Sequence, residues 1–235
     1  MDIQNIYNSI AELSREIVRE CTARSVKIST AESCTGGMIS GAVTSISGSS
    51  AVIELGVCSY SNRIKHEILH VPAEVLEQFT EYSVECAAEM AARILRRLKF
   101  DNDTITHVRK LVKYHDYPIE TTPRAVRRAI NTIGETYFSD VLAIKKADMM
   151  AQSTYQRQEK EDHLAQVEAL YQQILEQNQC VSLKSLALTG NDLIALGIPK
   201  GKEIGIVLNE LLEDVIAQPE HNNREYLIQL VQKHA

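Results

Sequence analysis

Residues 29–37 read STAESCTGG, and this stretch decides the fold of the first third of the chain. The segment 26–30 leads into it and is predicted as a short strand, while the small, apolar run 37–46 behind it is predicted as a tightly packed helix. A helical stripe over 4–22 precedes these elements, and a second strand is expected over 56–61. The order helix, strand, helix, strand indicates a layered α/β unit.

The same stretch is dense in hydroxyl groups and glycines, which predicts a ligand-binding turn. Gly36 and Gly37 let a ligand approach the backbone, and the helix behind them is expected to offer free N–H groups to a phosphate or an oxyanion. Ser33 is a candidate nucleophile if a base lies nearby, and Tyr60 and Lys65 at the end of the second strand are candidate proton carriers. From the spacing alone, a tight turn with capping hydroxyls is the favoured explanation, because isolated turn motifs are weak evidence.

Composition bounds the class of protein. The chain has 235 residues, 44% of them hydrophobic and 24% charged, with a net charge of −6, which predicts one or two globular domains rather than a disordered chain or a coiled-coil rod. Neither a membrane-spanning stretch nor a signal peptide is recognised, so a soluble cytoplasmic protein without a membrane partner is expected. Five widely spaced cysteines without a CxxC pair predict neither a disulfide framework nor a zinc site, and no metal or cofactor is expected.

Charge and periodicity change along the chain. Residues 97–146 carry a net charge of +4, between segments of −4 (1–96) and −6 (147–235). From about residue 83 onward only helical periods are evident, so the remainder is predicted to be all-α. Arg124, Arg127 and Arg128 are spaced to share one helix face, which is interpreted either as an RNA phosphate contact or as a solvated surface.

Two further motifs lie in the helical part. Lys200 and Lys202 flank Gly201 ahead of a predicted helix, which indicates a phosphate clamp for nucleic acid or a packing turn between helices. His115-Asp116 resembles a metal-binding doublet, but a metal site needs three or more converging ligands, so a surface pair is favoured.

The strings TAESCTGG (30–37) and SISGSSAVIELGVCSYSNRIKHEILHV (45–71) resemble the C-terminal domain of the CinA family, over residues 5–90. That family includes amidases that convert nicotinamide mononucleotide and water to nicotinate mononucleotide and ammonia. The resemblance implies Ser33 as nucleophile with Tyr60 and Lys65 assisting, although Arg63 competes with Lys65 for the lysine position. It also implies ligand contacts in two short segments, from Thr35, Gly36, Gly37, Ser49 and Ser50. The family's Thr-Gly-x-Ala-Gly-Pro loop, which completes the pocket, does not occur here.

A second resemblance covers residues 92–235. The strings LRRLKFDNDTI (95–105), LVKYHDY (111–117), RAVRRAINTIGE (124–135), KADMMAQS (146–153) and CVSLKSLALTGNDLIALGIPKGKEIG (180–205) are similar to the C-terminal part of bacterial CCA-adding tRNA nucleotidyltransferases with an HD domain. The resemblance implies tRNA contact. It implies neither nucleotidyl transfer nor a metal, because the catalytic head is missing and Asp148 lacks its metal-site partners.

The two resemblances predict a fusion with domains at 1–92 and 93–235, an α/β fragment joined through a helix to an all-α region with an HD remnant, body and tail. The fusion is either natural or an artefact of gene assembly. Three functions stay open: an impaired amidase on nicotinamide mononucleotide, a non-catalytic tRNA-binding module, and a fusion without activity. The truncated sheet leaves sheet edge and apolar surface uncovered, so either marginal stability of residues 1–92 or homo-oligomers are expected.

Overall fold

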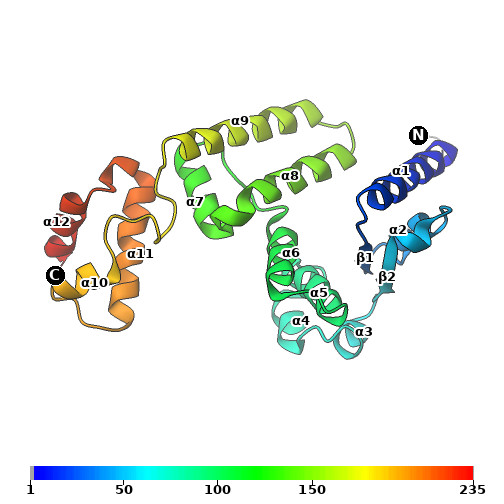
Figure 1. Ribbon diagram of the computed structural model, residues 1–235, viewed down its shortest axis with the longest axis horizontal. Coiled ribbons are helices and arrows are strands. Elements are labelled where there is room, and N and C mark those ends of the chain that lie inside the picture. The colour runs from blue at the N-terminus through cyan, green and yellow to red at the C-terminus, as the bar shows by residue number, and fades with distance from the viewer. Residues whose placement is uncertain (1–2, 235) are drawn as a thin grey trace. The chain divides into compact units, whose positions relative to one another are not determined.

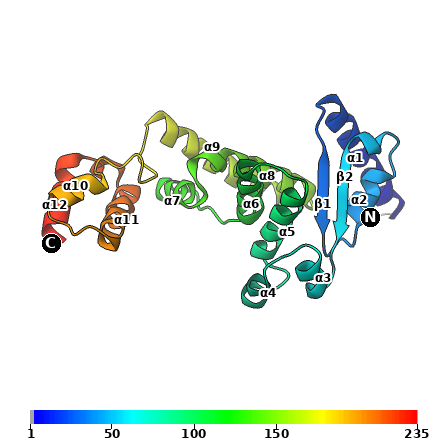
Figure 2. The ribbon, with the colours of Figure 1, turned by 60° about the horizontal axis from the view of Figure 1, so that its bottom comes forward.

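The computed structural model describes residues 3–234, which form two compact units that divide between Lys113 and Tyr114 (Figures 1 and 2). The first unit is the α/β part and the second is helical throughout its described residues. No described helix combines the length and the apolar character that a membrane crossing requires. The five cysteines are all free thiols.

The first unit is built on two parallel strands. Helix α1 (Ile3–Ala23) leads into β1 (Ile28–Glu32), and α2 (Met38–Thr44) and a short 3-10 turn (Ser49–Ala51) cross over to β2 (Ile53–Cys58). β1 and β2 pair in parallel from Ile28 opposite Ile53 to Glu32 opposite Cys58. The expected α/β order is thus confirmed, with β1 beginning two residues later and β2 three residues earlier than the sequence pattern indicates.

Helices cover both faces of this small sheet (Figure 2). One face packs against α1 and α2 through a core of Val18, Val43 and Val52. The other face packs against α5 (Val84–Arg97), whose Cys86, Met90 and Ile94 share a second core with Leu69 and Val71. Helices α3 (Asn62–Glu67), α4 (Ala73–Phe79) and α6 (Asn102–Tyr114) complete the unit. Two hydrophobic layers therefore hold the sheet, one near the start of the strands and the other nearer their end.

Within its described residues the second unit contains six α-helices and a short 3-10 helix, Pro219–His221. Helices α7 (Pro123–Ile133), α8 (Glu135–Ala151) and α9 (Arg157–Glu176) pack together, and α10 (Gly190–Ala195), α11 (Lys202–Ala217) and α12 (Arg224–His234) follow. Phe138 is fully buried in α8 and meets the ring of Tyr171 at 4.8 Å between centroids. A separate core around Leu193, Val215 and Leu227 unites the last three helices. The all-α character expected of this region is confirmed.

Local caps explain where several helices begin. The Thr122 side chain accepts a hydrogen bond from the Ala125 N–H ahead of Pro123, and Asp101 accepts one from the Thr104 N–H at 2.8 Å. The division between the compact units follows Lys113, downstream of α5, which packs on β1. The predicted domain boundary at residue 92 is the point at which one family resemblance gives way to the other. The compact units divide elsewhere, so this boundary stays a prediction.

Candidate active site

The turn after β1 is organised by Glu32, whose side chain is 3% exposed. Its carboxylate accepts hydrogen bonds from the Ile39 N–H (3.0 Å), the Ser40 N–H (2.9 Å) and hydroxyl groups. The donating hydroxyls belong to Thr30, Thr35 and Ser40. Burial by itself raises the pKa of Glu32, but the bonds donated by Ser40, Ile39 and Thr35 outweigh it and hold the pKa at about 2. The carboxylate therefore ties α2 to the end of β1.

This arrangement corrects one expectation about the turn. The first N–H groups of α2 were expected to be free for a phosphate, but Glu32 occupies those of Ile39 and Ser40, and the Met38 N–H donates to the Thr35 carbonyl. Gly36 and Gly37 do reverse the chain, with φ of 60° and 91°, values that favour glycine. The Thr35 hydroxyl donates to Glu32 at 2.8 Å, so its observed role is in the turn itself.

Ser33 follows Glu32 and meets Lys65 from α3. The Lys65 side chain is completely buried, and its Nζ lies 3.1 Å from Ser33 Oγ. The same Nζ donates to the carbonyl oxygens of Ser59 (2.9 Å) and Tyr60 (3.2 Å). Because β1 and β2 are parallel, the segments behind both strands meet at one edge of the sheet, which brings Ser33 and Lys65 together across 32 residues of sequence.

The other candidates near this pair are placed as follows. Arg63 is mostly exposed and pairs with Glu67 one turn along α3, so Lys65 is the basic residue that contacts Ser33. Tyr60 supplies its carbonyl to Lys65, but its side chain is 76% exposed. A hydroxyl relay through Tyr60 stays a prediction.

Ser49 and Ser50 lie at the opposite end of the sheet from Ser33. They belong to the 3-10 turn that precedes β2, whereas Ser33 follows the end of β1. The Ser49 hydroxyl donates to the Thr44 carbonyl at 3.3 Å, and Ser50 is exposed. A five-residue strand separates the two ends by roughly 16 Å, so within one copy these serines are not brought together with Ser33 and Lys65.

The arginines of α7 do not share one exposed face. Arg127 is 4% exposed, and its guanidinium donates to the Ile216 and Ala217 carbonyls and to Gln179. The expectation that Arg127 shares an exposed surface with the other two arginines was wrong. Its guanidinium N–H groups instead donate to carbonyl groups in the last turn of α11. Arg128 is partly exposed and pairs with Glu213 of α11, while Arg124 is exposed.

Lys200 and Lys202 are exposed and flank Gly201, the residue ahead of α11. His115, Asp116 and Asp148 line one cavity together with His163, but no group of three or more potential ligands placed to hold a metal ion occurs among residues 3–234. Lys145 also lines this cavity, and its Nζ donates a hydrogen bond to the His115 carbonyl oxygen at 3.0 Å. RNA contact by the exposed basic residues stays a prediction.

Sequence reasoning missed the two residues that organise the turn, Glu32 and Ser40. The signal for Glu32 is an acidic residue at the end of a strand, directly before the glycine turn and a helix whose N–H groups attract an anion. Gly56 carried a second signal, because a Cβ at that position would lie 2.8 Å from Ser40 Cβ. That glycine lets α2 approach β2 closely.

Comparison with known families gives one match for the N-terminal part of the chain and another for its C-terminal part. Residues 10–103 match the CinA C-terminal domain, and residues 78–231 match the tRNA nucleotidyltransferase domain 2 family. The two family models overlap over 78–103, a range that contains the whole of α5.

Individual relatives resemble the first part. A nicotinamide-nucleotide amidohydrolase PncC from Enterobacter agglomerans is 45% identical over 84 residues, covering 36% of this chain and 51% of the relative. A CinA-like protein from Prochlorococcus marinus is 41% identical over 85 residues, which is 36% of this chain and 20% of that protein. The chain therefore spans about half or less of the length of these relatives.

The crystal structure of the competence/damage inducible protein CihA from Agrobacterium tumefaciens is 45% identical over 37% of this chain and 53% of that chain, with a TM-score of 0.36. The match to the tRNA nucleotidyltransferase domain covers more than half of the 235 residues, and the CinA match covers most of the α/β unit. The chain belongs to the tRNA nucleotidyltransferase domain 2 family, and ahead of that region it carries a CinA C-terminal domain segment.

Proposed function

We propose that the α/β unit is a serine–lysine amidohydrolase that converts nicotinamide mononucleotide and water to nicotinate mononucleotide and ammonia. The observation that carries the proposal is the buried Lys65 Nζ at 3.1 Å from Ser33 Oγ. The PncC relative, which is named for this substrate class, supplies the substrate.

The geometry around Lys65 suits a base. In a neutral amine, two N–H bonds are enough for the Ser59 and Tyr60 carbonyl oxygens, so the lone pair is left for the Ser33 hydroxyl proton. Ser33 Oγ then attacks the carboxamide carbon while Lys65 takes the proton. The collapsing intermediate returns this proton to the leaving nitrogen, which departs as ammonia. Water then cleaves the Ser33 ester by the same route and restores the hydroxyl.

The test is ammonia release from nicotinamide mononucleotide by the full chain. We expect turnover that is lost in Ser33→Ala and in Lys65→Met, and retained in two matched controls at exposed positions, Ser47→Ala and Lys184→Met. Circular dichroism of each variant checks that Lys65→Met, which empties a buried site, still folds. Turnover that survives in folded Ser33→Ala contradicts the proposal, and so does a folded wild type that releases no ammonia.

A second function is proposed for the helical unit, namely tRNA binding without nucleotidyl transfer. It is favoured by the family match over residues 78–231 and by the exposed Lys200 and Lys202 at the start of α11. Removing one lysine that binds a phosphate should reduce the slope of log K against log salt by about 0.9.

The corresponding test is a salt titration of tRNA binding by Lys200→Ala/Lys202→Ala. The matched control is Lys184→Ala/Lys233→Ala, which removes two exposed charges elsewhere in the same unit. Equal salt slopes for the two double variants would contradict the assignment of the phosphate contact to Lys200 and Lys202.

A further inference from the structure

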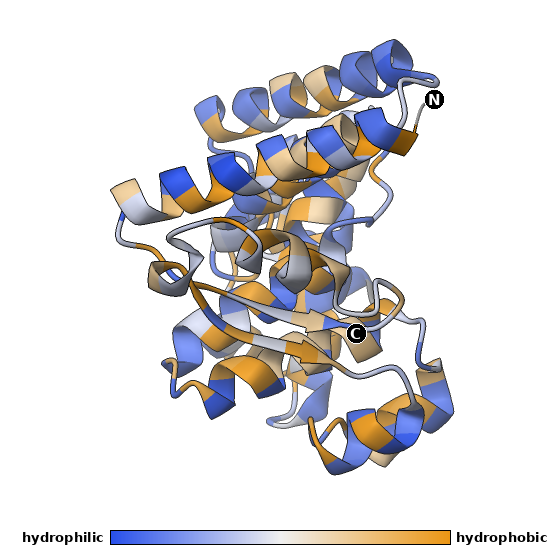
Figure 3. Ribbon diagram, turned by 90° about the vertical axis from the view of Figure 1, so that its right-hand side faces the viewer, coloured by the Kyte–Doolittle hydropathy of each residue, from blue (hydrophilic) through white to orange (hydrophobic). Residues whose placement is uncertain are grey.

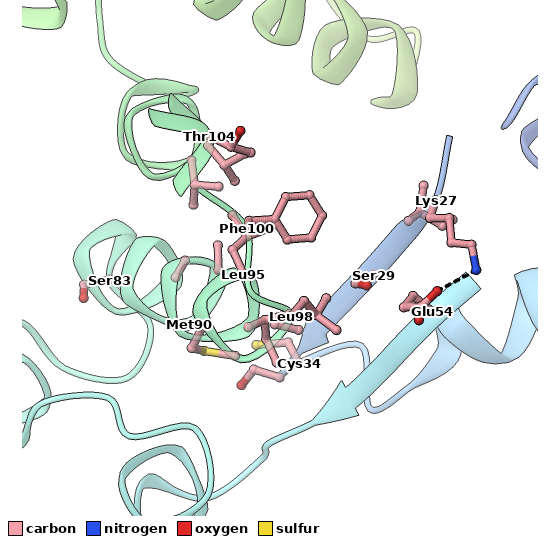
Figure 4. A pocket seen from close by; sticks show the side chains of 18 of the residues that line it. Lys27, Ser29, Cys34, Glu54, Ser83, Met90, Leu95, Leu98, Phe100 and Thr104 are labelled. Atoms are coloured by element: carbon pink, nitrogen blue, oxygen red, sulfur yellow. Dashed lines mark hydrogen bonds and ion pairs between the residues drawn. The ribbon is translucent and has the colours of Figure 1, made fainter. Parts of the chain in front are cut away.

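The first unit contains a cavity of about 940 Å³ that begins at the candidate active site (Figure 4). Ser33 and Cys34 line it at the end of β1, and Ser29 and Ala31 line it along the strand. Its volume falls in the range of roughly 300–1,000 Å³ that is typical of small-molecule sites. The candidate nucleophile Ser33 therefore borders a space large enough for a substrate body.

The wall opposite the strand is apolar. It is formed by side chains of α5, α6 and the segment between them, namely Met90, Ile94, Leu98, Phe100, Val108 and Val112. The lining runs along α5 from Ser83 to Leu98, a rise of about 22 Å in helix geometry. An extended aliphatic chain fits this shape, because it removes apolar surface from water over its whole length.

The charged lining residues of this cavity offer little to a phosphate, so the phosphate of a nucleotide bound at Ser33 would lie outside it. Lys27 contributes the cationic side chain of the lining, and it pairs with Glu54 at 2.7 Å. Glu81 is acidic and accepts a hydrogen bond from Asn62. A neutral apolar group is therefore the better occupant, since an anion would face two carboxylates and a cation that is already paired.

We propose that Ser33 and Lys65 also hydrolyse carboxylic esters whose aliphatic acyl chain lies in this cavity. The inference rests on the same residue pair as the proposed amidase function and adds a substrate class to it. Ser33 Oγ bonds to the ester carbonyl carbon and Lys65 accepts the serine proton. The alcohol leaves with that proton, and water hydrolyses the acyl-serine to release the carboxylic acid and restore the hydroxyl.

The experiment uses the full chain with p-nitrophenyl acetate, butyrate, octanoate and dodecanoate. We expect kcat/KM to rise from acetate to octanoate by about tenfold or more, because each methylene placed in an apolar pocket strengthens binding. The activity should disappear in Ser33→Ala and persist in Ser47→Ala. Ester hydrolysis that is unchanged in Ser33→Ala, or that does not rise with chain length, overturns the proposal.

A second variant tests the cavity rather than the nucleophile. Ala91 lines the cavity from α5, so Ala91→Phe fills it without emptying any packed site. We expect it to lower octanoate hydrolysis by about tenfold and to leave acetate hydrolysis within a factor of about two. Ala143→Phe, at an exposed position of α8, is the matched control. Equal octanoate rates for both variants also overturn the proposal.

Ammonia release from nicotinamide mononucleotide, measured on the same preparations, separates this inference from the proposed function. Serine-dependent ester hydrolysis without ammonia release supports the acyl cavity and contradicts the amidase. Ammonia release without chain-length-dependent ester hydrolysis supports the amidase and contradicts the acyl cavity. A folded protein that is inactive on both substrates contradicts both.

Discussion

Glu32 joins the turn that carries Ser33 to α2, and its charge makes that junction dependent on pH. Its folded-state pKa of about 2 lies below the ordinary value of 4.5. The ionised carboxylate therefore stabilises the fold fully above about pH 4.5, and this contribution is lost as the pH falls from there through about 2. We expect Glu32→Gln to lower the free energy of unfolding at pH 7 by about 2 kcal/mol.

Urea unfolding at pH 7 and pH 3 measures this effect. The difference between the two pH values should be smaller in Glu32→Gln than in the wild type, because the substituted amide does not titrate. Glu12→Gln, at an exposed position of α1, should keep the wild-type pH dependence. An unchanged pH dependence in Glu32→Gln would show that the carboxylate does not stabilise the turn.

Arg127 provides the second prediction at the scale of one residue. Its guanidinium satisfies two carbonyl groups at the end of α11, so Arg127→Ala leaves buried acceptors without donors. We expect a loss of about 2–3 kcal/mol in the stability of the helical unit. The exposed Arg124→Ala should change it by less than about 0.5 kcal/mol, as measured by chemical denaturation. Equal effects of the two substitutions would contradict the structural role of Arg127.

These residues show what the sequence can and cannot predict at this scale. The spacing of Arg124, Arg127 and Arg128 places them near one another on α7, but periodicity alone does not say how far the buried side of a helix extends. Val126, Ala129 and Ile130 are buried, and Arg127 lies on the same buried side of α7. The pairing of Ser33 with Lys65 was expected from family resemblance, whereas the donors around Glu32 become visible only when α2 is placed against β1.

At the scale of elements, α1 has a wider apolar surface than the rest of the unit covers. Ser14 and Val18 are buried, but a neighbouring stripe spaced 3, 4, 3 and 4 residues apart is 40–69% exposed, namely Ile3, Ile6, Ile10, Leu13 and Ile17. Figure 3 shows hydrophobic and hydrophilic residues alternating along the helix nearest the N-terminus. This spacing is that of a coiled-coil seam, which packs against another helix of the same kind.

We expect α1 to pair with α1 of a second copy. Leu13→Glu places a charge in the stripe and should shift the protein towards monomers in sedimentation velocity. Asn5→Glu adds the same charge outside the stripe and should leave the association unchanged. A wild type that is monomeric at all concentrations would contradict this pairing.

Strand ends were the least predictable part of the elements. The sequence placed β2 over 56–61, but the strand pairs from Ile53 because Ile28 of β1 stands opposite it. Ile53, Leu55 and Val57 are half-buried against the two hydrophobic cores, and they alternate with exposed residues. Such register depends on the partner strand, which local propensity does not contain.

At the scale of the whole molecule, the two compact units have separate cores. We expect Gly56→Ala, which forces a Cβ to within 2.8 Å of Ser40 Cβ, to destabilise the α/β unit by about 1–3 kcal/mol. It should leave the stability of the helical unit unchanged. Arg127→Ala should destabilise the helical unit and leave the α/β unit unchanged. Hydrogen exchange resolved by peptide measures both units in one sample, and a loss of protection in both units from either substitution would contradict their independence.

The local assembly of the Ser33–Lys65 pair has a consequence for how the chain acquires it. Glu32, Ser33 and Lys65 all lie within one strand–helix–strand crossover and the helix behind it. The contacts that shape the pair therefore all lie within residues 28–67, and none of them requires α7 or a later helix. A ribosome completes this segment long before it reaches α7, so Ser33 and Lys65 can meet while most of the helical unit is still unsynthesised. The crossover and α3 form one contiguous segment of the chain. Recombination downstream of α3 can therefore join this segment to a new C-terminal partner without separating Ser33 from Lys65.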